Sequence, residues 1–403
     1  MKKESNHNQL TLKKDSKEAL FTKEFLVLNG IIFLVYCNIA IFFQFYQYLK
    51  SLSIEPEWIG FLIGLFSLTA LVIRPFVSPI LNPENAIKWI YISLIAVIIS
   101  LLLYYPAKGQ LSMAFVRIMH GAAYVIMATA VIAKVVGVIP PKRSGEAFGM
   151  ISVITLLPYA VIPPILPPLI KKFDGFIPVL YLTALILVFV FPLLFLLKGK
   201  KSKQSAIPSD RIHLNDLIED LSDKRILLLL IISLLLFTAF TPIFYFIKSY
   251  GESVGITNPG WFFTISTFTE IAVRVFGGRM FDKFNKSVLL FISLFGLMVG
   301  YILLANIKGI LLFYWLGFFF GLSWEVALPV LNSLIFDISL PRFRALNTNL
   351  GLEMFQGGFF LGPFIGGFFI ANWNYSVLYY FCATLIVVGM AFTFMVTKID
   401  RRS

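Results

Sequence analysis

The residues of this chain that could do chemistry lie inside apolar segments. Glu325 stands near the middle of the run from 310 to 338, with Asn332 two helical turns beyond it. A charged side chain at the centre of a bilayer costs about 2.5–3.5 kcal/mol on insertion scales, so it usually faces a cavity or a partner. A carboxyl group in such a place can hold and release a proton. Glu325 is therefore our first candidate for a proton carrier, and a structural ion pair is the alternative.

A second polar face is predicted in the run from 111 to 138. Arg117, His120, Gly121 and Tyr124 follow one another there at i, i+3, i+4 and i+7. Arg117 either faces a central cavity or extends to the outer interface. The imidazole of His120 can titrate near neutral pH, but a structural role is equally open. The remaining candidates for a polar cavity are Gln44, Gln47, Asn349, Glu353 and Gln356.

One further pair of charges lies at helical spacing. Glu270 and Arg274 stand at i and i+4, in the favourable order for an ion pair along a helix. We expect them to neutralise each other, with a role in ligand binding as the alternative.

Motifs of enzymatic chemistry are absent from the sequence. It holds no G-x-x-x-x-G-K loop and no H-E-x-x-H, and its three histidines and two cysteines lack metal-ligand spacing. We therefore predict no enzymatic activity, no cofactor and no metal site.

Composition places the chain in a membrane. Hydrophobic residues make up 58% and charged residues 14%, with a mean hydropathy of +0.85, against about 45–50% and 25% in soluble domains. The net charge of +13 comes from tails and loops between apolar runs, which argues against nucleic acid as a partner.

Twelve apolar runs are long enough to cross a bilayer. They lie near 25–49, 58–81, 87–105, 111–138, 145–170, 176–197, 225–248, 260–281, 287–305, 310–338, 344–370 and 375–396. We predict an all-α integral membrane protein of two pseudo-symmetric six-helix bundles. The predicted parts are an N-terminal tail (1–22), a first bundle (23–197), a linker (198–224), a second bundle (225–397) and a C-terminal tail (398–403).

Lysine and arginine gather in the tails and in the loops on one side, so both termini are expected to face the cytoplasm. Lys171 and Lys172 are exceptions, because they lie in a loop on the opposite side. In the linker, a helix-start signal at Pro208-Ser209-Asp210 precedes apolar residues at helical spacing, which predicts a short amphipathic helix up to Leu221.

Two stretches repeat each other at a constant offset. In T-A-L-V-I-R-P-F-V-S-P-I-L-N-P-E-N and T-E-I-A-V-R-V-F-G-G-R-M-F-D-K-F-N, Arg74 aligns with Arg274, and Asn82 aligns with Asp282. The pattern indicates an internal duplication. The stretch from Gly278 to Lys286 resembles the loop motif G-x-x-x-D-R/K-x-G-R/K of the major facilitator superfamily, with Asn285 in place of a glycine. The candidate gating residues are Arg74, Asn82, Arg274, Gly278, Arg279, Asp282, Lys283 and Asn285.

The resemblance extends to other spans. R-I-M-H-G, at Arg117 to Gly121, is similar to the span-4 motif of the superfamily, which implies an arginine at the central cavity. G-P-F-I-G-G resembles a helix-bend motif, here in span 11, formed by Gly358, Gly362, Pro363, Gly366 and Gly367. Span 5 instead carries five prolines, which predict a kink. The stretch from Pro140 to Gly149 most resembles bacterial efflux permeases.

This resemblance implies an alternating-access transporter driven by an ion gradient. The leading expectation is proton-coupled export of a small amphipathic molecule. The alternative is uptake of a sugar, organic acid or metal chelate by proton symport, and a remote alternative is a membrane enzyme or sensor. The expected partners are the substrate, protons and the lipid bilayer, in a monomer of a bacterial inner membrane. The loop motif implies that Asp282 faces the start of span 5, whereas Asn82 faces the start of span 11 near Phe343.

Overall fold

The computed structural model describes residues 20–140, 143–197, 219–281 and 284–400, and these residues form helices and connecting turns. The elements of the first half are α2 (Lys23–Ala40), η1 (Ile41–Gln44), α3 (Phe45–Ser51), α4 (Pro56–Val77), α5 (Ala86–Leu103), α6 (Gln110–Val136), α7 (Ser144–Lys172), α8 (Phe176–Val188) and α9 (Val190–Phe195). Those of the second half are α11 (Lys224–Ser253), α12 (Trp261–Phe281), α13 (Lys286–Ala305), α14 (Ile310–Ile338), η3 (Pro341–Phe343), α15 (Arg344–Asn372) and α16 (Tyr375–Asp400).

The predicted twelve-span, all-α fold is confirmed. Eleven helical segments among the described residues are long and apolar enough to cross a membrane, and the first of them joins α2, η1 and α3 over Lys23–Ser51. The twelfth span is α12, which packs against α14 of its own half and against α7 of the other half. It is the more polar helix because it carries Glu270, Arg274 and Arg279.

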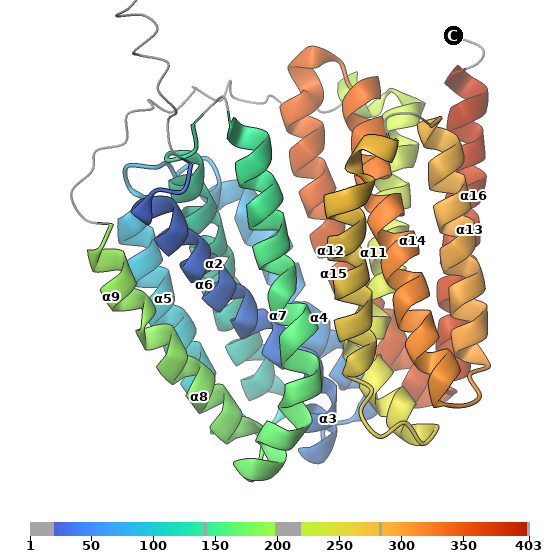
Figure 1. Cartoon of the computed structure of the whole chain (residues 1–403). Helices are drawn as coiled ribbons and strands as arrows, with labels where there is room; N and C mark the ends of the chain where they lie inside the picture. The colour runs from blue at the N-terminus through green and yellow to red at the C-terminus, as the bar shows by residue number, and fades with distance from the viewer. Residues whose placement is uncertain (1–19, 141–142, 198–218, 282–283, 401–403) are drawn as a thin grey trace, which may run out of the picture.

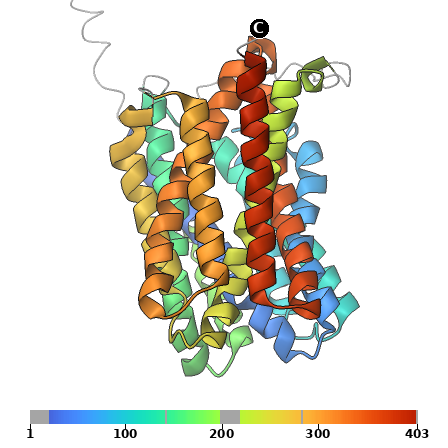
Figure 2. The same cartoon turned by 90° about the vertical axis from the view of Figure 1, so that its right-hand side faces the viewer.

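The two halves stand side by side, with α2–α9 on one side of Figure 1 and α11–α16 on the other. The start of α2 and the end of α16 lie at the same end of the bundle, here called the terminal side (Figures 1 and 2). The largest contacts between the halves are those of α4 along α15 and of α7 along α12. The cavity described below lies among α2, α7, α11, α12, α14 and α15.

The packing of α6 on α4 repeats in that of α14 on α12. A Cβ atom added at Gly121 would lie 2.7 Å from the Phe66 carbonyl oxygen, and one added at Gly321 would lie 2.3 Å from the Ser266 carbonyl oxygen. Each glycine is thus needed because a neighbouring helix backbone lies in its place. The same offset separates the two glycines and the two carbonyls, as the duplication predicts.

The α4–α15 contact is tight on the side opposite the termini. A Cβ atom at Gly60 would meet the Pro363 carbonyl oxygen at 2.3 Å, and one at Gly367 would meet the Gly60 Cα at 2.6 Å. Two backbones therefore lie directly against each other between the halves. This contact closes the opposite side of the interface.

The proline-rich helix α7 contributes to the same closure. It runs as one helix from Ser144 to Lys172 with five prolines inside it. Pro164 and Pro168 have no N–H for the carbonyls four residues earlier, at Ala160 and Pro164. Across the interface, Thr264 Oγ1 donates to the Ala160 carbonyl at 2.6 Å, and Asn258 Nδ2 donates to the Pro164 carbonyl at 3.1 Å. The second half thus supplies the donors that the prolines remove.

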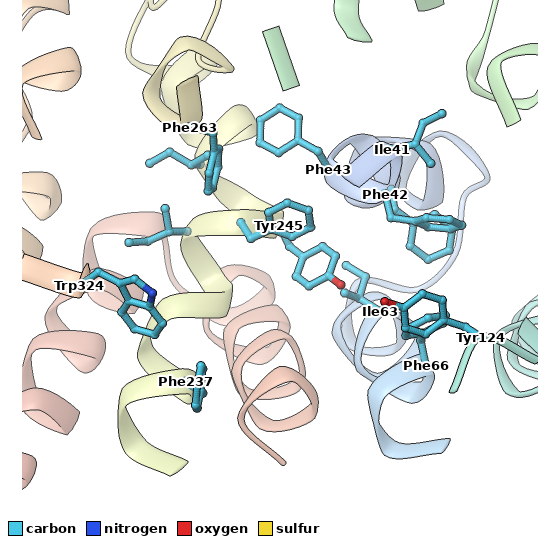
Figure 3. Close-up of a cluster of buried hydrophobic side chains, with 14 of the residues drawn as sticks. Ile41, Phe42, Phe43, Ile63, Phe66, Tyr124, Phe237, Tyr245, Phe263 and Trp324 are labelled. Atoms are coloured by element: carbon cyan, nitrogen blue, oxygen red, sulfur yellow. The ribbon is translucent and has the colours of Figure 1, made fainter. Parts of the chain in front are cut away.

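Span 1 changes its winding at the middle of the molecule. The 3-10 segment η1 joins α2 to α3 and packs against α7 and α11. Its Phe42 and Phe43 belong to a core of aromatic and aliphatic side chains from both halves (Figure 3). In this core Tyr245 lies between Trp324 of the second half and Phe66 of the first half. A short 3-10 stretch within a long helix is a common site for a hinge.

The predicted linker helix lies mostly outside the described residues. Of that segment, residues 219–221 are described and helical. Glu219 forms an ion pair with Arg342, and Asn347 Nδ2 donates to the buried Asp220 carboxyl at 3.1 Å. The end of the linker is therefore attached to the corner between α14 and α15.

Candidate functional site

A cavity of about 470 Å³ lies between the halves and reaches the first turns of α15 on the terminal side. Most of its wall comes from α11, α12, α14 and α15, and the first half contributes only residues of α2 and α7. The lining residues from the first half are Tyr36, Thr155, Leu156 and Tyr159. The site is therefore asymmetric, although the fold is duplicated.

Ten of the 23 residues that line the cavity are aromatic. Phe240 and Trp324 stack with ring centroids 4.2 Å apart and planes at 24°. Phe355 and Phe359 lie 4.4 Å apart on α15. Such a wall binds planar apolar groups through their faces and edges.

A buried ion pair joins α12 to α14 beside the cavity. The Arg274 guanidinium donates two hydrogen bonds to the Glu325 carboxylate, both at 2.6 Å, and a third across the interface to the Ser152 hydroxyl. The Glu325 side chain is 2% exposed. The expected pairing of Arg274 with Glu270 was wrong, because the guanidinium points across to α14 rather than along its own helix.

Glu270 is left without an ion-pair partner within 4 Å among the described residues. It lines the cavity, is 6% exposed, and accepts a hydrogen bond from the Ser266 hydroxyl at 3.0 Å. Its carboxyl lies close enough to interact electrostatically with both Arg274 and Glu325. The cluster therefore holds two carboxyl groups and one guanidinium, and the guanidinium binds Glu325.

Arg117 lies away from the cavity and is sealed inside the first half. It is 1% exposed, donates to the Leu62 and Ile63 carbonyls of α4 at 2.9 and 2.6 Å, and faces the rings of Phe42, Phe45 and Phe66 within about 5 Å. In this conformation it neither lines the cavity nor extends to the outer interface, the two placements expected from the sequence. At the equivalent position Gly317 packs directly on the Phe262 carbonyl.

His120 belongs to the same sealed cluster. Asn38 Nδ2 lies 3.1 Å from its Nε2, and the Tyr104 hydroxyl lies 3.2 Å from its Nδ1. With the amide in this orientation, Nε2 accepts and the proton resides on Nδ1. Tyr124, also buried, packs on Phe66.

The span-1 glutamines lie at the interface between the halves. Gln44 is buried in η1, and its Nε2 has no hydrogen-bond partner among the described residues. Gln47 Nε2 donates to the Ser249 hydroxyl of α11 at 2.9 Å. Neither lines the cavity, and Gln47 ties the two halves together on the side opposite the termini.

On α15, the predicted polar stripe is displaced from the cavity by one residue. Asn349 is exposed, Gln356 is buried, and Glu353 approaches Arg74 electrostatically; none of the three lines the cavity. Asn347 and Thr348 line it instead. A helical wheel drawn for α15 alone could not have selected between these adjacent faces.

The predicted bend motif is a packing surface in this conformation. Cβ atoms added at Gly358, Gly362 and Gly366 would each collide with α11, whereas Gly367 meets α4. α15 runs as one helix through Pro363. The motif thus brings α15 close to two helices at once.

The structure describes some of the candidate gating residues. Arg74 and Arg274 occupy equivalent positions toward the terminal side, in α4 and α12. Gly278 and Arg279 lie in the last turns of α12, and Asn285 caps α13 by accepting from the Val288 N–H at 3.1 Å. Its backbone is extended, not left-handed. Asp282 and Lys283 lie outside the described residues.

Among the described residues, no hydrogen bond joins the Asn82 side chain to the start of α15, which the loop motif led us to expect it to face. Its side-chain oxygen accepts from the N–H groups of Glu84 and Asn85 at 3.0 and 2.9 Å, and Asn85 Oδ1 accepts from the Asn82 N–H. The loop therefore occupies the side-chain oxygen of Asn82, the acceptor that a latch on the N–H groups of a helix start would use.

The sequence reasoning missed the aromatic wall and Arg344. In a chain with 43 phenylalanines, a cavity-lining ring carries no signal that separates it from a lipid-facing one. Arg344 had been counted only as a loop charge, yet it lines the cavity. Asn332, two turns from Glu325, does line the cavity as the helical spacing favoured.

Comparison with known proteins now decides the family. The model described as Major Facilitator Superfamily matches residues 28–260 and 254–403. The chain belongs to the Major Facilitator Superfamily. The family resemblance expected from the loop and span motifs is therefore confirmed.

Two curated relatives are named for export and for drug resistance. The staphylopine export protein of Staphylococcus aureus (strain Mu50) is 23% identical over 356 residues, which cover 84% of this chain and 86% of that protein. The quinolone resistance protein NorA of Staphylococcus aureus is 25% identical over 186 residues, covering 45% of this chain and 47% of that protein.

Solved structures share the fold. The nucleoside transporter NupG has a TM-score of 0.76 at 16% identity, covering 94% of this chain and 100% of that one. A bacterial homolog of the human lysosomal transporter Spinster, inward-facing and unoccupied, has a TM-score of 0.74 at 13% identity, covering 95% and 98%. At these identities the likeness shows the fold alone.

This major facilitator protein is thus a multi-pass membrane transporter of small molecules, from a family of transporters rather than enzymes. Within the described residues no group of three or more histidine, cysteine or acidic side chains could hold a metal ion.

Proposed function

We propose that this protein exports a small amphipathic molecule in exchange for protons, by alternating access of the cavity to the two sides of a bacterial cytoplasmic membrane. The observation that carries the proposal is the cluster of Glu270, Arg274 and Glu325 beside an aromatic cavity. The similarity to the staphylopine export protein supports the direction.

The coupling follows from the charge balance of the cluster. With Arg274 bound to Glu325, the second carboxyl, Glu270, has no counter-ion of its own. It can be neutralised by a proton or by a cationic group of a substrate in the cavity. Because both compete for one carboxyl, a proton bound from one side replaces the substrate, which is the requirement for exchange. Glu325 holds Arg274 away from Glu270 and so keeps this site open.

The orientation rests on the distribution of positive charge. The terminal side carries the basic tails and loops, so we place it in the cytoplasm. The cavity reaches this side through the first turns of α15, and the opposite side is closed by the α4–α15 and α7–α12 contacts. The conformation therefore suits loading from the cytoplasm. We also propose that the protein functions as a monomer and does not bind nucleic acid.

The test uses proteoliposomes with an acidic lumen, a membrane potential clamped by potassium and valinomycin, and ethidium as an aromatic amphipathic cation. Proton exchange concentrates ethidium in the acidic lumen whatever the orientation of the protein. Proton symport, the uptake alternative, drives it outward instead. Absence of protein-dependent flux in either direction would contradict coupled transport of this probe class.

The same assay tests the cluster. Glu270→Gln removes the exchangeable carboxyl, and Glu325→Gln frees Arg274 to bind Glu270. We expect both variants to lose pH-driven accumulation, because neither leaves a carboxylate at residue 270 that can exchange a proton for a cation. Glu353→Gln and His120→Gln, outside the cavity wall, should retain accumulation. If Glu353→Gln or His120→Gln abolished it instead, the proton carrier would lie at that residue.

A further inference from the structure

Arg344 lies in the cavity wall without an anion. It begins α15, and its guanidinium stands 4.3 Å from the ring centroid of Phe336, which also lines the cavity. Its Nε is shielded from solvent and has no hydrogen-bond partner, and no carboxylate lies within ion-pair distance among the described residues. Arg342, two residues earlier, is paired with Glu219. The two neighbouring arginines therefore differ in that only Arg344 is uncommitted.

The Nε–H group of Arg344, shielded from solvent and without an acceptor among the described residues, is unfavourable for the protein alone. A ring face attracts the charge but does not satisfy the five N–H donors of arginine. A charged donor that loses water without gaining an acceptor costs free energy. A carboxylate matches the planar guanidinium with two parallel hydrogen bonds, so it is the group that this wall lacks.

The cavity also has an uncommitted acid, Glu270. The third charged residue of the wall, Arg274, already binds Glu325. Glu270 lies about the middle of α12, whereas Arg344 lies at the terminal end of α15. The rings of Phe240, Trp324, Phe355 and Phe359 belong to the same wall. The cavity thus has a carboxyl group at Glu270, a guanidinium at Arg344, and aromatic rings in the wall that they share.

We infer that the preferred substrate is amphoteric: an aromatic molecule whose cationic group binds Glu270 and whose carboxylate binds Arg344. The inference rests on the proposed use of this cavity for transport and adds the anionic half of the recognition. Arg344 discriminates by charge: it attracts a carboxylate, and it repels a molecule that brings only a cation to the cavity mouth.

The experiment measures direct binding, without a pH gradient, to the full-length protein in nanodiscs of neutral phosphatidylcholine. The probes share one naphthalene scaffold with its two charged groups at opposite ends: zwitterionic 6-(aminomethyl)-2-naphthoic acid, its cationic methyl ester and its anionic N-acetyl derivative. Trp324 in the cavity wall provides a fluorescence signal for their binding. We expect the zwitterion to bind at least tenfold more tightly than either derivative.

Variants assign each preference to one residue. Arg344→Gln should lower the preference of zwitterion over ester to about one, and Arg344→Lys should restore part of it. Glu270→Gln should remove the preference over the N-acetyl derivative. Arg342→Gln makes the same change at the neighbouring paired arginine and should leave all three affinities unchanged. Size-exclusion profiles and thermal unfolding show that each variant is folded.

Equal or tighter binding of the ester, no effect of Arg344→Gln on the ratio, or no binding of the zwitterion at millimolar concentration would each overturn the inference. Addition of phosphatidylglycerol tests the lipid as the source of the anion: if it displaced the zwitterion only when Arg344 is present, a headgroup phosphate would be the occupant instead. The proposed function fails separately, if the zwitterion binds as expected but no proton-driven flux is found.

Discussion

The charged residues inside the two halves have opposite uses. Arg117 is fully committed to α4 carbonyls and three rings, whereas Glu270 and Arg344 are uncommitted at a cavity. A buried group whose contacts are complete stabilises one structure, and one whose contacts are incomplete is available for a ligand. The distinction depends on neighbours from other helices, so residue type and spacing could not reveal it.

Arg117 provides a test of stability. We expect Arg117→Lys to lower the free energy of unfolding by about 2–3 kcal/mol, because the charge stays buried while the ammonium cannot reach both carbonyls and the three rings. Arg117→Met removes the buried charge and keeps much of the volume, so it should be less harmful than lysine. Thermal unfolding in detergent measures both, with Arg344→Lys as the control. A lysine variant as stable as the parent would show that these contacts contribute little.

At the scale of the helices, prolines create the interface between α7 and α12. The sequence predicted only a kink in span 5. The structure shows that Pro164 and Pro168 leave carbonyl groups free for Thr264 and Asn258 of the other half. These side chains form hydrogen bonds that hold the halves together on the side opposite the termini.

Thr264→Val should weaken this closure. The hydroxyl that satisfies the Ala160 carbonyl is lost while the side-chain shape is kept, so the closed state loses about 1 kcal/mol, a roughly fivefold change in the ratio of states. Distances between spin labels at Lys172 and Val254, both exposed, should shift toward longer values, with Cys37 and Cys382 replaced. Thr269→Val is the matched control because the Thr269 hydroxyl bonds within its own helix. Identical distributions in the two variants would contradict the role of the cross-half bond.

The docking of the linker end, residues 219–221, against α15 is expected to depend on pH. Burial raises the pKa of the Asp220 carboxyl above its ordinary value of 3.8, with contributions from Asp223 and Glu219, while the Asn347 hydrogen bond opposes the shift. Since the pKa is higher when residue 220 is docked, docking is most favourable below the ordinary pKa and weakens as the pH rises through the raised one.

Asp220→Asn should keep the segment docked and remove this pH dependence, because the amide cannot ionise. Hydrogen exchange of the amides at 219–223, corrected for the intrinsic rate, measures docking between pH 4 and pH 7.5. The parent should lose protection across this range, and the variant should not. The same loss in both proteins would place the titrating group elsewhere.

For the whole molecule, apolar length and a constant offset were enough to predict the twelve spans and the duplication. These signals depend only on residues within one helix, where the spacing of residues in the sequence fixes their spacing in space. The site was predicted less well, because the Arg274–Glu325 pair and the sealed position of Arg117 depend on which helices become neighbours. Asn82 shows the same limit: its local loop competes successfully for the contact that the family motif implies.

The unequal division of the cavity wall has a consequence for how this protein can evolve. Most of the residues that line the cavity belong to α11, α12, α14 and α15, whereas the first half contributes four from α2 and α7. Under selection for a new substrate, adaptive substitutions should therefore accumulate in the second half. The first half, whose Arg117 cluster is sealed, would remain under purifying selection. The two halves, which arose by duplication, would thus diverge at different rates. The second half, which lines most of the cavity, would change faster than the first.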